Sequence, residues 1–459
     1  MRGVADSLMM HSWLVLGFVA AVAGYDYTTV PGLNHDTWWG PEGKEEDTSI
    51  RPFQIKWEKA MIDDLVYRLE NRREFVPSMD DTAYHYGVNT HTIGYWLDYW
   101  ARDYNFTARE AYVNKHPQFI TNMQGLDVHF VRIVPEVPEG KRKIPLLLLH
   151  GFPGSFLEFH EAIDHLIAGV ADKDFVFEIV APSLIGFGYS DYTNKQGLGG
   201  AEMAVIFKKL MNRLGHDKFF VQGGDWGAHI ADIMVVFFQE EIIGMHTNLG
   251  MALTDKAFSM ISMGSLYPEA LMPNDLIGRL YPLKDTLQWL MREFGYFHFQ
   301  ATKPDTIGIC VTDTPSGMFA WFAQLISMAS RRANYDDPRG GLDLYTPEQL
   351  IDNAMIYWAP NKASSAMRIY AETVNWRNYD MGFINEPSSV PIVVVQAPDE
   401  IYYMPPAALN TKYTNLVAVD VLSEGGHFLA YEMPEQFAKL VISAVERILN
   451  HKQCDKSEL

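Results

Sequence analysis

The fold is decided by one stretch of the sequence, Lys218-Phe219-Phe220-Val221-Gln222-Gly223-Gly224-Asp225-Trp226-Gly227. Its first half is apolar enough for a buried strand, and an apolar helical pattern follows over 228–238. Gly223 and Gly227 stand two residues before and after Asp225. A nucleophile flanked in this way by small residues is typical of a sharp strand-to-helix turn, on which the nucleophile is usually serine. We therefore predict that Asp225 is a nucleophile on such a turn.

An aspartate at this position changes the chemistry that we expect. A serine nucleophile forms an ester that breaks at the acyl carbon of the substrate. A carboxylate that attacks an alkyl carbon forms an ester whose carbonyl carbon belongs to the enzyme. The substrates are then electrophilic alkyl carbons, such as those of epoxides or alkyl halides, rather than esters and amides.

A histidine and an acid follow Asp225 in the order expected for a hydrolase. His427, in Glu424-Gly425-Gly426-His427-Phe428, comes after a late apolar run and is placed to act as a general base. The preceding apolar run ends in Gln396-Ala397-Pro398-Asp399-Glu400. Asp399 and Glu400 both qualify by position as the acid that orients the histidine, because the order nucleophile, acid, histidine is the α/β-hydrolase order. The other carboxylate would be an ordinary loop residue.

A loop rich in glycine and proline also follows an early strand, at His150-Gly151-Phe152-Pro153-Gly154-Ser155. Such a loop can turn a backbone N–H group towards the nucleophile and form half of an oxyanion hole. The N–H group of Trp226 would be the other half. Taken alone, the loop is equally well read as a plain turn at a strand end.

Composition and periodicity predict one large α/β protein. The chain has 459 residues, of which 48% are hydrophobic and 13% aromatic, so it can bury a large core. Apolar runs alternate with helical patterns, which predicts a mostly parallel sheet. Between 251 and 375 the pattern is helical and indicates an insertion placed like a lid. The expected strands are 126–133, 145–149, 175–180, 219–222, 242–248, 390–396 and 416–422.

Several functions are disfavoured by the sequence. A formal net charge of −20 argues against nucleic acid as a partner, because phosphate binding needs basic patches. His160 and His165 are five residues apart, which puts them on different faces of a helix, so we expect no zinc site. The two cysteines, Cys310 and Cys454, imply no disulfide framework.

The N-terminus carries the one membrane signal. Leu8 to Gly24 is apolar except for two residues, which is short for a span of roughly 20 residues. Ala21-Val22-Ala23 is similar to a signal-peptidase site. A cleaved signal peptide and a short retained anchor are both compatible with this segment.

Taken together, these motifs resemble the microsomal epoxide hydrolases, and most of all the insect juvenile hormone epoxide hydrolases. The resemblance rests on His150 to Ser155, Gly223 to Gly227, Gly425 to Phe428, Trp38 to Pro41 and Gln300 to Thr306. It implies an α/β-hydrolase fold with a helical lid insertion and an N-terminal wrapping segment. The expected divisions are an anchor or signal-like segment over 1–24, a wrapping segment with the first strand over 25–140, the core over 141–250 and 376–459, and the lid over 251–375.

The resemblance also implies an activity and further site residues. A small apolar epoxide, either a juvenile hormone-like terpenoid or a xenobiotic, would react with water to give a vicinal diol without a cofactor or metal. Tyr296 and Tyr370 match the family's two lid tyrosines, which donate hydrogen bonds to the epoxide oxygen. Glu400 matches the family's acid, and the N–H groups of Phe152 and Trp226 would form the oxyanion hole. Phe152 stands where the family usually has tryptophan, so the pocket should differ in shape there.

The resemblance places the protein at the endoplasmic reticulum, held by a single N-terminal membrane attachment, or outside the cell if residues 1–23 are cleaved. Two other functions remain open from the sequence. A haloalkane dehalogenase would share the aspartate nucleophile and the base, but would not need paired lid phenols. A binding protein that holds an apolar ligand without turnover would not need the nucleophile, acid and base together.

Overall fold

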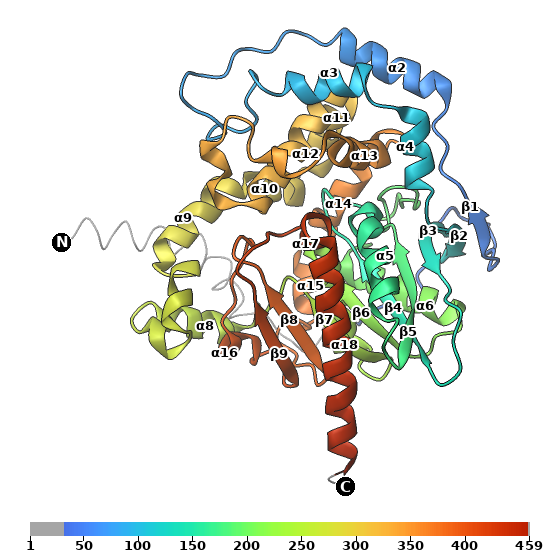
Figure 1. Ribbon diagram of the computed structural model, residues 1–459, viewed down its shortest axis with the longest axis vertical. Helices are drawn as coiled ribbons and strands as arrows, with labels where there is room; N and C mark the ends of the chain where they lie inside the picture. Colours follow the sequence, from blue (N-terminus) through green and yellow to red (C-terminus); the bar gives the residue numbers. More distant parts are fainter. Residues whose placement is uncertain (1–31, 458–459) are drawn as a thin grey trace.

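In the computed structural model, which describes residues 32–457, nine strands form one sheet in the order β1-β2-β3-β5-β4-β6-β7-β8-β9 (Figure 1). From β5 to β9 all neighbouring strands are parallel, whereas β1, β2, β3 and β5 pair antiparallel. The predicted mostly parallel sheet is therefore confirmed. The strands are β1 (Arg51–Phe53), β2 (Gln118–Met123), β3 (Leu126–Ile133), β4 (Arg142–Leu149), β5 (Phe175–Pro182), β6 (Phe219–Gly223), β7 (Ile242–Thr247), β8 (Ile392–Gln396) and β9 (Leu416–Val421).

Every strand expected from the sequence is present, but the sequence did not reveal β1 and β2. Both are short and lack a long apolar run, so their own composition gives little signal. β2 is positioned by its antiparallel pairing with β3. A tight turn at Gln124 and Gly125, with φ angles of 52° and 90°, joins the two strands. Positive φ at both residues of such a link is typical of a β-hairpin.

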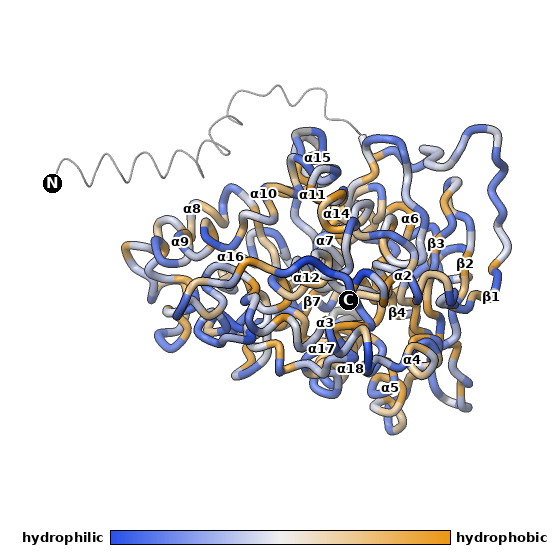
Figure 2. The backbone as a smooth tube through the Cα atoms, turned by 90° about the horizontal axis from the view of Figure 1, so that it is seen from above, coloured by the Kyte–Doolittle hydropathy of each residue, from blue (hydrophilic) through white to orange (hydrophobic). Residues whose placement is uncertain are grey.

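Helices cover both faces of the sheet, which explains why its central strands are apolar throughout. Every residue of β6 and β8 is buried, as expected for parallel strands packed on both sides. In Figures 1 and 2, α5 (His160–Gly169) and α18 (Pro434–Ser457) lie on one face, with η2 (Phe156–Phe159) leading into α5. The other face carries α6 (Gly200–Arg213) and α7 (Asp225–Phe237).

The order of the strands places a topological switch point at the carboxyl edge of the sheet. β4 lies between β5 and β6, so the chain leaves β4 towards one side and returns to its other side. In parallel sheets, ligands bind where the chain reverses direction in this way, because the connections diverge there. The loops after β4 and β6 are those that carry His150 and Asp225.

A helical region separates β7 from β8. Figure 2 shows hydrophobic and hydrophilic stretches alternating along α8 and α9, as expected for helices with one covered face. The elements are α8 (Asp255–Gly264), η3 (Pro268–Ala270), η4 (Asn274–Arg279), α9 (Leu283–Glu293), α10 (Gly295–Thr302), α11 (Pro304–Asp313), α12 (Pro315–Ser330), η5 (Arg332–Asp336), η6 (Leu342–Leu344), α13 (Pro347–Trp358), α14 (Ala363–Thr373) and α15 (Trp376–Asp380). The later short helices are α16 (Pro406–Leu409) and α17 (Leu429–Glu432).

The N-terminal helices α2 (Lys59–Glu70), α3 (Gly94–Arg102) and α4 (Phe106–Val113) run over this helical region (Figure 1). The rings of Trp96 and Trp100 on α3 each pack 6.2 Å from the ring of Phe319 on α12. Arg109 on α4 pairs with the buried carboxylate of Asp352 on α13. Apolar packing and charge therefore both tie the N-terminal segment to the inserted helices.

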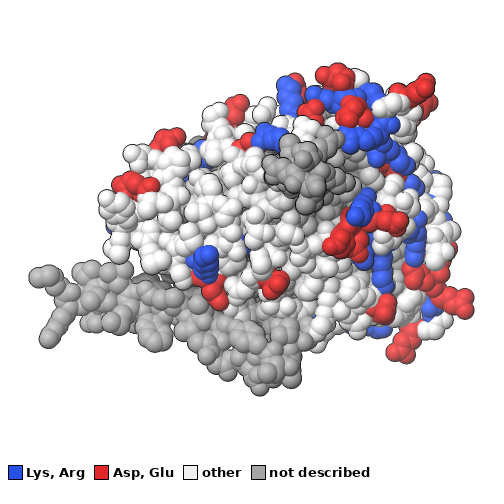
Figure 3. Space-filling model, turned by 90° about the horizontal axis from the view of Figure 1, so that it is seen from below, with Lys and Arg blue, Asp and Glu red and all other residues white. Residues whose placement is uncertain are grey.

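Within residues 32–457, none of the helices has the length and apolar character needed to cross a membrane. The apolar stretch expected to act as an anchor or signal, 8–24, lies outside the described residues. On the face drawn in Figure 3, acidic and basic side chains are interspersed towards one side, while the rest of that face carries few charges.

Candidate active site

Asp225 is the first residue of α7 and follows β6 after a single residue. Its φ of 49° lies in the left-handed region, which costs a non-glycine residue roughly 1–2 kcal/mol. A Cβ atom at Gly227 would lie 2.0 Å from the carbonyl oxygen of Leu149, so the turn can fold against the end of β4 only with glycine there. The sequence predicted the helix from residue 228, but it begins at Asp225. The carboxylate thus stands at the positive end of a helix dipole.

The loop after β4 reaches the nucleophile. The backbone N–H of Phe152 donates a hydrogen bond of 2.6 Å to Asp225 Oδ1. A Cβ atom at Gly151 would lie 2.0 Å from the same oxygen, so this close approach also requires glycine. The Phe152 N–H therefore lies beside the nucleophile, at the position expected from the sequence. The second expected donor, Trp226, is the next residue of α7.

His150 fixes the shape of this loop rather than reacting. Its Nε2 accepts a hydrogen bond of 3.1 Å from the Leu184 N–H, so its Nδ1 carries the proton and donates to the Gly151 carbonyl at 3.1 Å. Burial lowers the pKa of His150 to about 4, which keeps the ring neutral. Helix α13 holds the other end of the loop, because Asn353 donates to the Pro153 carbonyl and the Tyr357 hydroxyl donates to the Gly154 carbonyl.

His427 connects the nucleophile to an acid. Its Nε2 lies 3.1 Å from Asp225 Oδ2, and its Nδ1–H donates to Glu400 Oε1 at 2.6 Å. The backbone of His427 is also held, since its N–H donates to the Ala329 carbonyl and its own carbonyl accepts from the Asn248 side chain. The imidazole is therefore fixed between two carboxylates and cannot turn away.

The structure distinguishes the two acids that the sequence left open. Glu400 is buried against His427, whereas Asp399 accepts only a long bond of 3.4 Å from the backbone N–H of Arg332. The Ile401 N–H also donates to Glu400 Oε1 at 2.6 Å, which fixes the position of this carboxylate.

The charges around His427 favour its protonated form. Burial alone would lower the pKa of His427, but the charge of Glu400 and the hydrogen bond to Asp225 outweigh it and raise this pKa well above the usual value. The resting site therefore contains an imidazolium between two carboxylates. Losing the negative charge on Asp225 would remove one cause of the raised pKa.

The two expected lid tyrosines meet above the nucleophile. Tyr296 lies on α10 and Tyr370 on α14, and their rings pack edge to face at 6.1 Å. The Tyr370 ring also packs 4.7 Å from the Trp226 ring. Burial raises the pKa of both phenols well above the usual value, and the Asp225 charge raises it further. Both hydroxyls therefore keep their protons and can donate hydrogen bonds.

Sequence reasoning missed Glu432, which supports the base. Its carboxylate accepts the N–H groups of Gly426 and Phe428 at 2.8 and 3.1 Å, on either side of His427. Burial raises the pKa of Glu432 to about 7, although the hydrogen bonds from these two N–H groups act to lower it. The carboxylate belongs to α17, which has only four residues, so no periodic pattern marks it in the sequence.

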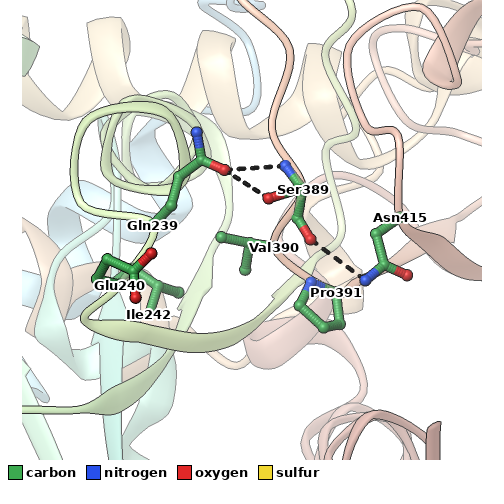
Figure 4. Close-up of a pocket in the computed structure, with 7 residues that line it drawn as sticks. All are labelled: Gln239, Glu240, Ile242, Ser389, Val390, Pro391 and Asn415. Carbon is green, nitrogen blue, oxygen red and sulfur yellow. Dashed lines mark hydrogen bonds between the residues drawn. The ribbon is translucent and has the colours of Figure 1, made fainter. Parts of the chain in front are cut away.

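A separate hollow of about 430 Å³ lies at the other edge of the sheet (Figure 4). It is lined by Gln239, Glu240, Ile242, Ser389, Val390, Pro391 and Asn415. Ile242 begins β7, whereas the reactive side chains follow the carboxyl ends of their strands. The Gln239 side-chain oxygen accepts from the N–H and O–H of Ser389. No cluster of metal-ligating side chains occurs in the part of the chain that the structure describes.

Comparisons with known proteins agree with this geometry. Residues 50–159 match the epoxide hydrolase N terminus family, and residues 144–267 match the alpha/beta hydrolase fold family. The chain is 44% identical over 419 residues to juvenile hormone epoxide hydrolase of Bombyx mori, covering 91% of each chain. It is 34% identical over 454 residues to epoxide hydrolase 1 of Oryctolagus cuniculus, covering 94% of this chain and 98% of the relative.

A solved structure is similar over almost the whole described molecule. The crystal structure of the juvenile hormone epoxide hydrolase of the silkworm Bombyx mori superposes with a TM-score of 0.90 at 44% identity. The match covers 92% of this chain and 100% of the silkworm chain. The resemblance expected from the sequence is thereby confirmed.

Proposed function

The chain belongs to the epoxide hydrolase family that includes the insect juvenile hormone epoxide hydrolases and mammalian epoxide hydrolase 1, and we propose that it converts apolar epoxides to vicinal diols through an ester on Asp225. One observation carries the proposed mechanism. The hydrogen-bonded series Glu400, His427 and Asp225 ends directly below two phenols on the inserted helices, Tyr296 and Tyr370. A nucleophile with its base on one side and proton donors on the other suits the opening of a strained ring.

In the first step, Tyr296 and Tyr370 donate hydrogen bonds to the epoxide oxygen. Asp225 Oδ1 is held by the Phe152 N–H, so Oδ2 attacks the ring carbon and Oδ1 becomes the carbonyl oxygen of the ester. The new C–O bond forms as the ring C–O bond breaks. The electron pair of the broken bond stays on the substrate oxygen, which takes a proton from a phenol.

In the second step, His427 changes from an acid to a base. Esterification removes the charge of Asp225, which lowers the pKa of His427, and its proton restores the phenol. Neutral His427 then accepts a proton from a water molecule that attacks Asp225 Cγ. The oxyanion on Oδ1 rests on the N–H groups of Phe152 and Trp226. Collapse breaks the bond between Asp225 Cγ and Oδ2, and Oδ2 takes the proton of the added hydroxyl group and leaves with the diol. The Asp225 carboxylate and protonated His427 then return.

We propose an apolar epoxide of the juvenile hormone or xenobiotic kind as the substrate. The rings of Phe152, Trp226 and Phe297 surround Tyr370 at 4.7 to 5.7 Å, so the walls near the reacting oxygen are largely aromatic. Relatives named for juvenile hormone support the first kind. Rates of diol formation on a juvenile hormone and on a styrene-type epoxide would distinguish the two.

Asp225→Ala is expected to lower diol formation at least about 10⁴-fold, because the covalent route then has no nucleophile. His427→Gln is expected to form the ester but not to hydrolyse it, so mass spectrometry should find the Asp225 peptide heavier by the mass of the substrate. Diol formation at the normal rate by Asp225→Ala, in a sample free of native enzyme, would refute the ester mechanism.

We also propose the following division of the chain and its location. Residues 141–250 and 376–459 act as the catalytic core, residues 251–375 act as a lid, and residues 25–140 wrap over it. This division is supported by the position of α8 to α14 between β7 and β8. Residues 1–24 attach the protein to the endoplasmic reticulum membrane, a proposal that rests on the apolar run 8–24 and on the family.

A further inference from the structure

Glu158 is an acid near the nucleophile that the mechanism above does not use. It lies on η2, between the loop after β4 and helix α5. Although the residue is only half-buried as a whole, its Oε1 atom is buried and has no hydrogen-bond partner among the described residues. A buried acceptor without a partner is destabilising and therefore requires an explanation.

The carboxylate of Glu158 points along the loop that holds the nucleophile. A Cβ atom at Gly154 would lie 1.5 Å from Glu158 Oε1, so the carboxylate occupies the space that this glycine leaves free. Burial raises the pKa of Glu158 to about 8, and the Asp225 charge raises it further. The His427 charge and the backbone of Gly151 lower it. Glu158 is thus within electrostatic reach of both groups that hydrolyse the ester.

The other titratable groups that face Glu158 are phenols. Its charge contributes to the raised pKa of Tyr357 on α13 and of Tyr431 on α17. The hydroxyl of Tyr357 is committed to the Gly154 carbonyl, and that of Tyr431 to the Gln349 carbonyl. Neither phenol therefore serves as the partner of Glu158 Oε1, which leaves this acceptor available.

The water that hydrolyses the ester needs more than one partner. Buried water typically makes about three hydrogen bonds, and His427 Nε2 can accept only one of them. We propose that Glu158 is the second acceptor for this water and holds it in line with Asp225 Cγ. The inference rests on the proposed ester mechanism and makes Glu158 a water-positioning residue of the second step.

The charge of the nucleophile would also control Glu158. While Asp225 is a carboxylate, its repulsion favours protonated Glu158. Esterification removes that repulsion and so favours the Glu158 carboxylate, whereas the loss of the His427 charge in the same step opposes this effect. An ionised carboxylate is the stronger acceptor for water.

The test is Glu158→Gln, which keeps the shape but removes the ionisable group. In single-turnover stopped flow with quenched mass analysis of the Asp225 peptide, we expect ester formation within about twofold of native and hydrolysis slowed roughly 10- to 100-fold. Ester should accumulate, and kcat and KM should fall together. Glu161→Gln on α5 is the matched control, because Glu161 accepts the Tyr112 hydroxyl away from the site. It should leave both steps unchanged.

Hydrolysis at the native rate in Glu158→Gln would overturn the inference, as would equal slowing of both steps. If this variant does not fold, Glu158→Asp replaces it, since the carboxylate remains but is withdrawn by one methylene. Slower hydrolysis with normal ester formation would then support the inference, and unchanged hydrolysis would overturn it. Absence of any ester on Asp225 in native enzyme would instead refute the proposed mechanism itself.

Discussion

Tyr370 and Tyr296 face the same nucleophile but are held differently. Tyr370 is 1% exposed and packs against both Trp226 and Phe152, the two residues of the expected oxyanion hole. Tyr296 is only partly buried by its neighbours, and its ring contacts Phe294 and Phe297. Both phenols therefore lie on the inserted helices, but Tyr370 is packed against core residues whereas Tyr296 is more exposed.

Tyr370→Phe and Tyr296→Phe should each slow ester formation about 10²-fold, because each removes one donor to the developing alkoxide. The double variant should lose nearly all activity, since no donor then remains. Single-turnover rates with the His427→Gln background would isolate this step. Tyr413→Phe is the control, because Tyr413 donates to Asp232 and Met251 elsewhere in the core. Normal ester formation in the double variant would contradict the role of the phenols.

Site residues were predictable from the sequence where a local motif and the order of the catalytic residues along the chain point to the same position. Asp225 and His427 stand in glycine-rich turns after apolar runs, and these patterns are local. The choice between Asp399 and Glu400 was not local, because it depends on which side chain the turn after β8 directs towards His427. Glu158 and Glu432 were not predictable, since their environment is formed by loops that are distant in sequence.

At the scale of elements, α4 and α13 are joined by a charged contact. The Nε atom of Arg109 lies 3.0 and 3.1 Å from the two carboxylate oxygens of Asp352, and the Tyr104 hydroxyl donates to the same carboxylate at 2.6 Å. The Asp352 side chain is 2% exposed. The same helix α13 holds the loop of Phe152 through Asn353. The N-terminal segment thus braces the loop beside the nucleophile.

Arg109→Met should destabilise the protein by about 3–5 kcal/mol, because it leaves the buried Asp352 carboxylate without its positively charged partner. Urea unfolding would measure this loss. Lys59→Met, which removes the exposed pair of Lys59 with Asp63 on α2, should cost at most about 0.5 kcal/mol. Equal effects of the two variants would mean that the α4–α13 contact does not stabilise the fold.

Strands with long apolar runs of their own were easier to predict from the sequence than strands without them. β4, β6 and β8 have long buried runs, and the sequence located them within three residues. β2 pairs with the edge of β3, and β1 pairs with β2. These strands were missed because a strand's own residues do not show which strand it will pair with. Helix α7 begins three residues before the predicted start at 228, because its first turn is the sharp turn that carries Asp225.

At the scale of the whole molecule, desolvation by burial keeps five histidines within residues 32–457 neutral. Burial lowers the pKa of His129 and His160 to about 3, and that of His150, His229 and His246 to about 4. Below the unfolded value near 6.5, the unfolded chain binds protons that the folded protein does not. The folded state therefore loses stability as the pH falls from about 6.5 towards 4. His427 has the opposite sign, so its contribution is complete below about 6.5 and is lost as the pH rises through its raised pKa.

His246 on β7 allows this acid sensitivity to be tested one group at a time. Neither of its ring nitrogens has a hydrogen-bond partner among the described residues, so leucine can replace the ring at little cost. The free energy of unfolding of native protein should fall by about 1.4 kcal/mol per pH unit for each such histidine between pH 6 and 4.5. His246→Leu should remove the contribution of one histidine to this pH dependence, which is about 2 kcal/mol of unfolding free energy between pH 6 and 4.5.

Urea unfolding at several pH values would measure both slopes, with His91→Gln as the control because its side chain is exposed. The control should run parallel to native protein, while His246→Leu should become relatively more stable as the pH falls. Parallel curves for all three proteins would mean that His246 is protonated in the folded state. In that case the acid sensitivity would arise from the other four histidines or from carboxylates whose pairs with Arg and Lys are lost on protonation.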